Sequence, residues 1–208
     1  MAHGVHAVQH EVEHEIKHGE HGGGHSSLLD NVNKKVALLI GVLALFLAFS
    51  ETLGKSAQTG ALSYNIEAAN LWAFFQAKNI RRTVVLTAAE EMTVNAPAAP
   101  ETIKASATKQ IDVWQKSAAR YRSEPETGEG TTELAERAKT MEKKRDTALA
   151  KHHHYEVASA AFQIGIVLAS ATVITGMMLL TWLAVGLGGI GVLFTAIGLF
   201  APHAVHIF

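Results

Sequence analysis

The N-terminal segment of the chain carries seven histidines spaced three or four residues apart. If this segment is helical, that spacing places all seven on one face; they are His3, His6, His10, His14, His18, His21 and His25. Imidazoles one turn apart can bind a divalent metal such as Zn, Ni or Cu, and the interleaved glutamates would add oxygen ligands. The same face would repel itself once protonated at about pH 6, so it would also suit a proton sensor. A solvated polar tail is the third interpretation, and the sequence leaves all three open.

Other histidine patterns are weaker signals of chemistry. The protease motif H-E-x-x-H occurs at His10–His14 and at His14–His18, but a four-residue histidine repeat interleaved with glutamate produces it automatically. His152, His153 and His154 are consecutive, so on a helix they point in different directions and chelate poorly. Apart from the histidine segment, we expect no cofactor.

Catalytic motifs of other kinds are missing from the sequence. There is no Walker loop, no dinucleotide-binding glycine motif and no nucleophile elbow. The chain has no cysteine, which excludes thiol nucleophiles and thiolate metal sites. Lys and Arg number 18 against 19 Asp and Glu, whereas a nucleic-acid-binding face needs a basic excess. We therefore expect neither an enzyme nor a nucleic-acid-binding protein.

Glu51 lies at the end of the first apolar run and is the one acidic residue close to it. An acidic side chain inside a bilayer suggests an ion or proton pathway. Lys55, four residues later, offers the alternative of an interfacial ion pair. Gln163, the one strongly polar side chain of the second apolar run, is expected to form an interhelical hydrogen bond.

The elements that position these residues are predicted to be helices. Residues 36–50 and 157–201 contain no Asp, Glu, Lys or Arg, and a span needs about 20 apolar residues. The sequence therefore predicts an all-α integral membrane protein with three transmembrane helices. We assign residues 1–33 to the histidine segment, 34–54 to the first span, 55–156 to an extramembrane region, 157–183 to the second span and 187–208 to the third span and tail. The glycines at 186–189 would form the hairpin between the last two spans.

The extramembrane region is predicted to be a helical, coiled-coil bundle. Apolar residues recur at spacings of three and four within 55–95 and 101–123, and from Thr131 one such stripe continues toward the second span. The basic residues flanking the spans favour opposite orientations, so the side of the membrane occupied by the bundle stays open.

Small residues form stripes at helical spacing along the last two spans. Without a hydrophobic driving force in lipid, such stripes allow helices to pack closely. We predict an assembly face that includes Gly165, Gly176, Gly191 and Gly198. The partner helix could belong to the same chain or to another copy.

The stretch from Glu67 to Arg81 contains Asn70, Trp72, Gln76, Lys78 and Arg81 in a distinctive pattern. This motif resembles a bacterial membrane-protein family catalogued as domain of unknown function four-three-three-seven. The resemblance implies the same layout of one span, a charged helical region and a terminal pair of spans, and it implies no activity. Independently, polar residues beside an aromatic on a bundle helix can fix the register between subunits, which is the role we predict for these five.

These observations favour a structural or accessory protein in the bilayer of the cell inner membrane. It would assemble as a homo-oligomer or with other membrane-protein subunits. The alternative is a metal- or pH-responsive channel or transporter that uses the histidine segment. The spans show no continuous polar face, which a permeation path usually needs, so we place this alternative second.

Overall fold

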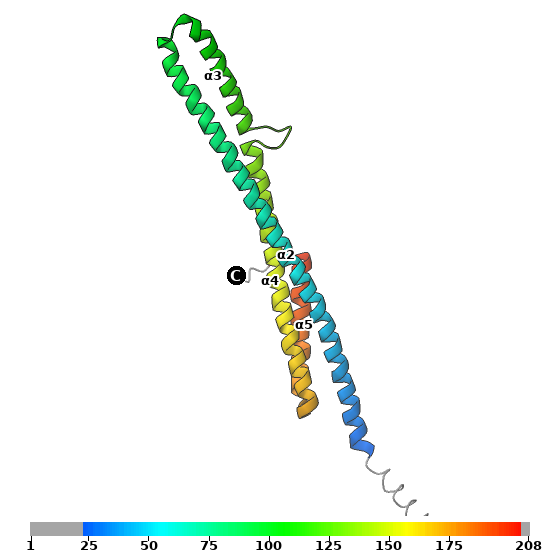
Figure 1. Cartoon of the computed structure of the whole chain (residues 1–208). Helices are drawn as coiled ribbons and strands as arrows, with labels where there is room; N and C mark the ends of the chain where they lie inside the picture. The colour runs from blue at the N-terminus through cyan, green and yellow to red at the C-terminus, as the bar shows by residue number, and fades with distance from the viewer. Residues whose placement is uncertain (1–22, 205–208) are drawn as a thin grey trace, which may run out of the picture. The chain divides into compact units, whose positions relative to one another are not determined.

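The described part of the chain is built from helices joined by short turns and loops. The computed structural model describes the backbone of residues 23–204 and the side chains of residues 33–204. Its elements are α2 (Gly23–Asn95), the short 3-10 turn η1 (Ala96–Ala98), α3 (Glu101–Arg122), α4 (Thr131–Thr175) and α5 (Met178–Phe200) (Figure 1). No strand occurs between residues 23 and 204. The predicted all-α class is confirmed for this part of the chain.

The helices divide into two compact units. The apolar unit comprises residues 23–53 and 154–201, and the polar unit comprises residues 54–153 and 202–204. Helices α2 and α4 therefore contribute to both units, whereas α3 belongs to the polar unit and α5 to the apolar unit. By length and composition, α2, α4 and α5 are each apolar enough to cross a membrane.

In the apolar unit, a stripe of small residues on α5 packs against large side chains of α4 and α2. The buried members of the stripe are Ala184, Gly188, Gly191, Thr195 and Gly198. A Cβ added at Gly191 would lie 2.6 Å from the Phe162 ring, and one at Gly188 would lie 2.7 Å from a Leu43 methyl group. The predicted close packing is therefore found, and the partner helices belong to the same chain.

Phe162 of α4 is the centre of this packing. Its side chain is 0% exposed, it clusters with Leu43 and Ala158, and its ring stacks on that of Phe46 at 5.9 Å between centroids. Every atom of the ring is thus enclosed, and the missing side chain of Gly191 provides the space it occupies.

The turn between the last two apolar helices lies at Gly176 and Met177, and the predicted hairpin at residues 186–189 is wrong. Gly176 has φ +69, and its N–H donates to the Thr172 carbonyl oxygen at 2.8 Å, which caps the end of α4. Residues 186–189 lie inside α5. The physical reason is packing: Gly188 and Gly191 need helical spacing to lie against Leu43 and Phe162, and Gly176 supplies the left-handed backbone of the turn. Gly176 is consequently a turn residue and not part of the helix-packing face.

In the polar unit, α3 runs back beside the end of α2 after the turn at η1 (Figure 1). The proline residues at 97 and 100 end α2 and precede α3, as the sequence predicts, since proline cannot continue a helix. The core of this unit joins Leu71 of α2 to Leu134 and Ala138 of α4. Trp72, Phe75 and Met141 pack around it.

We expect Gly191→Ala to destabilise the protein in detergent by about 1–3 kcal/mol, because the added methyl group overlaps the enclosed Phe162 ring. Gly189→Ala is the matched control on the same helix, since a Cβ there meets nothing within 4 Å. Thermal unfolding followed by circular dichroism would measure both variants. Equal stability of the two variants would contradict the packing described here.

Candidate functional site

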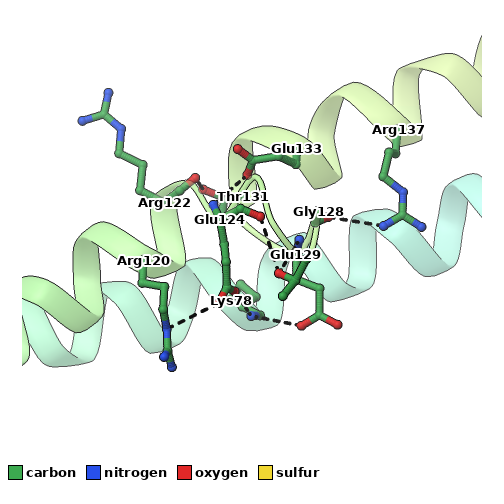
Figure 2. Close-up of polar contacts among 10 residues, drawn as sticks. Lys78, Arg120, Arg122, Glu124, Gly128, Glu129, Thr131, Glu133 and Arg137 are labelled. Carbon is green, nitrogen blue, oxygen red and sulfur yellow. Dashed lines mark hydrogen bonds and ion pairs between the residues drawn. The ribbon is translucent and has the colours of Figure 1, made fainter.

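Lys78 of α2 is a buried cation at the point where α3, the following loop and α2 meet (Figure 2). The residue is only 7% exposed, and its Nζ lies 3.6 Å from Glu124 and 3.4 Å from Glu129. The same Nζ lies over the rings of Phe74 and Tyr121, 5.5 and 5.7 Å from their centroids. Two carboxylates and two aromatic faces thus compensate for the water that the ammonium group loses on burial.

The loop between α3 and α4 is held by the first turn of α4. The Glu133 carboxylate accepts hydrogen bonds from the Ser123 hydroxyl and from the Glu124 backbone N–H, the latter at 3.2 Å. The Ser123 hydrogen bond, followed by the backbone ones, lowers the pKa of Glu133 from its ordinary value of 4.5. These bonds fix the backbone of Glu124, and thereby one of the two anions beside Lys78.

Gly130 is required by this loop because it directly precedes α4 where the chain passes close to itself. A Cβ at Gly130 would lie 2.6 Å from the backbone nitrogen of Glu124 and 2.6 Å from the Cα of Ser123. Neither atom belongs to a flexible side chain, so no larger residue fits without moving the loop. On the other side of the loop, Arg137 donates to the carbonyl oxygen of Gly128 at 3.3 Å.

Trp72 joins α2 to α4 in the same unit. Its indole N–H donates to the Glu142 carboxylate at 2.9 Å, and its ring meets Phe75 edge-on at 5.4 Å. Two turns before Trp72 on α2, the side-chain oxygen of Asn65 accepts a hydrogen bond from Arg145 at 3.4 Å. The contacts of Trp72 therefore resemble those of Lys78: both tie α2 to its neighbours within the chain.

The five residues of the Glu67–Arg81 motif are separated by the structure into two sets. Trp72 and Lys78 face the chain's own α3 and α4, as described above. Asn70, Gln76 and Arg81 are exposed. Trp72 and Lys78 thus have partners inside the chain, and the intersubunit role of the five residues stays a prediction.

The face of α2 opposite Leu71 and Lys78 is exposed and largely apolar. We call it the outer face; its members are Leu62, Ile66, Ala69, Ala73, Gln76 and Ile80. Leu62, Ile66 and Ile80 are 60%, 53% and 64% exposed. The apolar side chains of this face cannot be explained by packing within the described chain.

Polar side chains of the apolar unit pair between helices. Gln163 of α4 donates to the Glu51 carboxylate of α2 at 3.2 Å, which confirms the predicted interhelical hydrogen bond. The buried Ser50 hydroxyl donates to the Tyr155 carbonyl oxygen at 3.1 Å. An ion pair between Glu51 and Lys55 is not found among the described residues. Glu51 therefore acts here as an acceptor that links α2 to α4.

The predicted assembly glycines of the last two helices have contacts inside the chain. Gly165 faces the Ala184 carbonyl oxygen, and Gly198 faces the Tyr155 ring and the Cβ of His154. Together with Gly191, they allow α4 and α5 to approach closely within one molecule.

The histidines of the N-terminal segment, His3 to His25, lie outside the residues whose side chains the structure describes. His154 is buried and stacks on Phe194, with 6.1 Å between ring centroids. Within residues 33–204, no group of three His, Asp or Glu side chains is arranged to hold a metal ion.

The family described as Domain of unknown function (DUF4337) matches residues 32–201 of the chain. The chain belongs to this family. The matched range covers most of both units and includes the Glu67–Arg81 motif, so the resemblance predicted from that motif is confirmed. Most of the histidine segment precedes the DUF4337 range. Searches of curated proteins and of solved structures find no match.

Sequence reasoning missed the acidic partners of the DUF4337 chain, Glu124, Glu129, Glu133 and Glu142. A glutamate at the third position of a helix commonly accepts a hydrogen bond from a backbone N–H near the helix start. Glu133, third in α4 after Gly130, could therefore have been recognised from the sequence. Glu124, Glu129 and Glu142 had no comparable signal, because their roles depend on the fold of α3 and α4 around α2.

We expect Lys78→Met to destabilise the polar unit by about 1–3 kcal/mol, because Glu129 would lose its cation and Glu124 would keep only the exposed Arg120, at 3.7 Å. Lys116→Met is the matched control, since Lys116 is exposed and pairs only with Asp112 on the helix surface; its effect should stay within about 0.5 kcal/mol. Chemical denaturation in detergent would measure both. Similar effects of the two substitutions would contradict the role assigned to Lys78.

We expect Glu133→Gln to lower stability at neutral pH and to matter less in acid. Because the folded-state pKa of Glu133 is lowered, its ionised form stabilises the fold above the ordinary value of 4.5, and this contribution is lost as the pH falls through the folded-state pKa. The difference in melting temperature between wild type and variant should therefore shrink between about pH 7 and about pH 3. Glu136→Gln, exposed on the same helix, is the control. A difference independent of pH would contradict the assignment.

Proposed function

We propose that this protein is a three-span integral membrane protein whose polar unit acts as a non-catalytic assembly module. In this proposal it resides in the inner membrane, as a structural or accessory component of an oligomer or of a larger membrane complex. The observation that carries the assembly role is the outer face of α2, where Leu62, Ile66 and Ile80 are exposed in the charged part of the chain.

The apolar unit supports insertion in a bilayer. Its helices pack inward through small residues and direct large apolar side chains outward, including Leu38, Leu45 and Trp182, which are 70%, 71% and 72% exposed. Such a surface would be unstable in water and suits lipid. The hydrogen bond from Gln163 to Glu51 satisfies polar groups that lipid would leave without partners.

The polar unit has a different composition that suits an aqueous environment. Its exposed positions carry surface ion pairs such as Lys104–Glu101 and Lys116–Asp112, at 2.9 and 2.7 Å. Exposed apolar residues that recur on one helix face mark an interaction surface, and charged side chains around that face are costly to bring into lipid. The outer face therefore favours a protein partner.

The three-span topology predicts that residues 116 and 177 lie on opposite sides of the membrane. The chain has no cysteine, so Lys116→Cys and Met177→Cys each introduce a single thiol, both at exposed positions. A membrane-impermeant maleimide applied to intact cells or spheroplasts should label one variant and not the other, and inverted vesicles should give the reverse pattern. Labelling of both from the same side would refute the topology.

A further inference from the structure

The outer face of α2 is uncovered, although the inner face of the same helix in the polar unit is packed. Ala68, Leu71 and Lys78 on the inner face are each no more than 7% exposed. On the outer face, Ile66 and Ile80 are more than half exposed, and Ala73 between them is exposed as well. A helix that is apolar on opposite faces is stable only when both faces are covered.

The spacing of the outer face indicates that its partner is another helix. Ile66, Ala73 and Ile80 are seven residues apart, as are Leu62, Ala69 and Gln76. These two series correspond to the a and d positions of a coiled coil. A strict seven-residue repeat drifts around a straight helix, and a pair of left-handed supercoiled helices keeps it at one interface.

Two positions of the same repeat are again apolar and exposed near the start of α2. Leu38 and Leu45 occupy positions that the series 66, 73, 80 reaches when continued backwards in steps of seven, and the positions between, 52 and 59, are threonines. Gly41, at the position between Leu38 and Leu45, is exposed, and a Cβ there would meet nothing within 4 Å. The chain's own packing therefore does not require a glycine at 41, whereas close approach of a neighbouring helix would.

We propose that the outer face is covered by the α2 helix of a second copy of this chain, parallel to the first and in register. A partner that follows the whole repeat has to be apolar alongside Leu38 and Leu45 and has to carry a heptad pattern alongside Ile66 and Ile80. Helix α2 itself has both properties. The parallel direction rests on the proposed function, because copies inserted in one bilayer share the same orientation.

In this pairing, each residue of the a and d series meets its own counterpart. Ile66 and Ile80 bury their side chains against each other's copies, and Ala73 between them allows the two backbones to approach. Gln76 has both a donor and an acceptor, so two Gln76 amides can hydrogen-bond across the interface. A polar pair at one such position fixes register and copy number, which accounts for an exposed glutamine in an otherwise apolar series.

Self-crosslinking of single-cysteine variants tests both the partner and its direction. In the cysteine-free chain, Ile66→Cys, Ala73→Cys and Ile80→Cys should each form a disulfide-linked dimer in membranes after mild oxidation, since a disulfide needs Cα atoms about 4.4–6.8 Å apart. Ala119→Cys, exposed on α3, is the control and should remain monomeric. Crosslinking of Ala73→Cys alone would mean an antiparallel pair and would overturn the proposal. Equal crosslinking of Ala119→Cys would reveal random collision and would overturn it too.

Ile80→Glu tests the same interface without a covalent bond. Native mass spectrometry of the full chain in detergent should show a dimer for wild type. The dimer of Ile80→Glu should be at least about tenfold weaker, because the symmetric interface would bury two introduced charges, one from each copy. Ile103→Glu, at a comparably exposed position on α3, should leave the dimer intact. Unchanged helix content and melting temperature of the Ile80→Glu monomer would exclude misfolding as the cause.

The outcomes distinguish the pairing from the membrane topology. A monomeric wild type whose residues 116 and 177 are labelled from opposite sides overturns the second-copy proposal and leaves the three-span anchor standing. A dimer whose two positions are labelled from the same side overturns the topology, and with it the reason for the parallel direction.

Discussion

Helix α2 has apolar side chains on opposite faces, and each face needs a neighbour that removes it from water. In the polar unit the inner face meets α4 through Leu71, Leu134 and Ala138. In the apolar unit the inward residues Val36 and Leu43 meet α4 and α5. The other helices are arranged to cover one face of α2, and none of the described elements covers its outer face. This constraint connects the fold of the single chain with its proposed assembly.

The ion pairs of Lys78 in the polar unit also cover the inner face of α2. A lysine on the inner face of α2 is buried only because the loop after α3 brings Glu124 and Glu129 to its ammonium group. That loop depends in turn on Gly130, which allows the close approach, and on Glu133, which binds the Glu124 backbone. The position of Lys78 thus determines which face of α2 is inside and leaves the apolar outer face exposed.

Much of the fold could be predicted from the sequence, because the relevant signals are local. The prolines at 97 and 100 end one helix and start another, and the small residues of α5 are spaced for close packing. The turn at Gly176 could not be placed, since several glycines between 176 and 189 satisfy the local requirements. The burial of Gly188 against Leu43 inside α5 excludes the later ones, and this contact is visible only in the fold.

The candidate site was less predictable than the fold, because its residues act across helices. The motif around Trp72 and Lys78 is unusual in composition, but composition does not show that these two face α4 and the α3–α4 loop. The acidic partners lie more than forty residues further along the chain, and many other glutamates are equally good candidates in sequence. Pairing residues so far apart in the sequence requires knowledge of how α3 and α4 are arranged around α2.

The inward-facing and exposed residues of the Glu67–Arg81 motif have different physical roles. Residues with partners inside the chain, such as Trp72 and Lys78, hold α2 at a fixed rotation about its axis. That rotation determines which residues remain outside, and it presents Ile66, Ala73, Gln76 and Ile80 together. A change of about 100° in this rotation would shift the exposed series by one residue, which would place Glu67 and Arg81 where Ile66 and Ile80 now lie. Trp72 and the buried Lys78 are therefore residues through which the inner packing of α2 defines its outer surface.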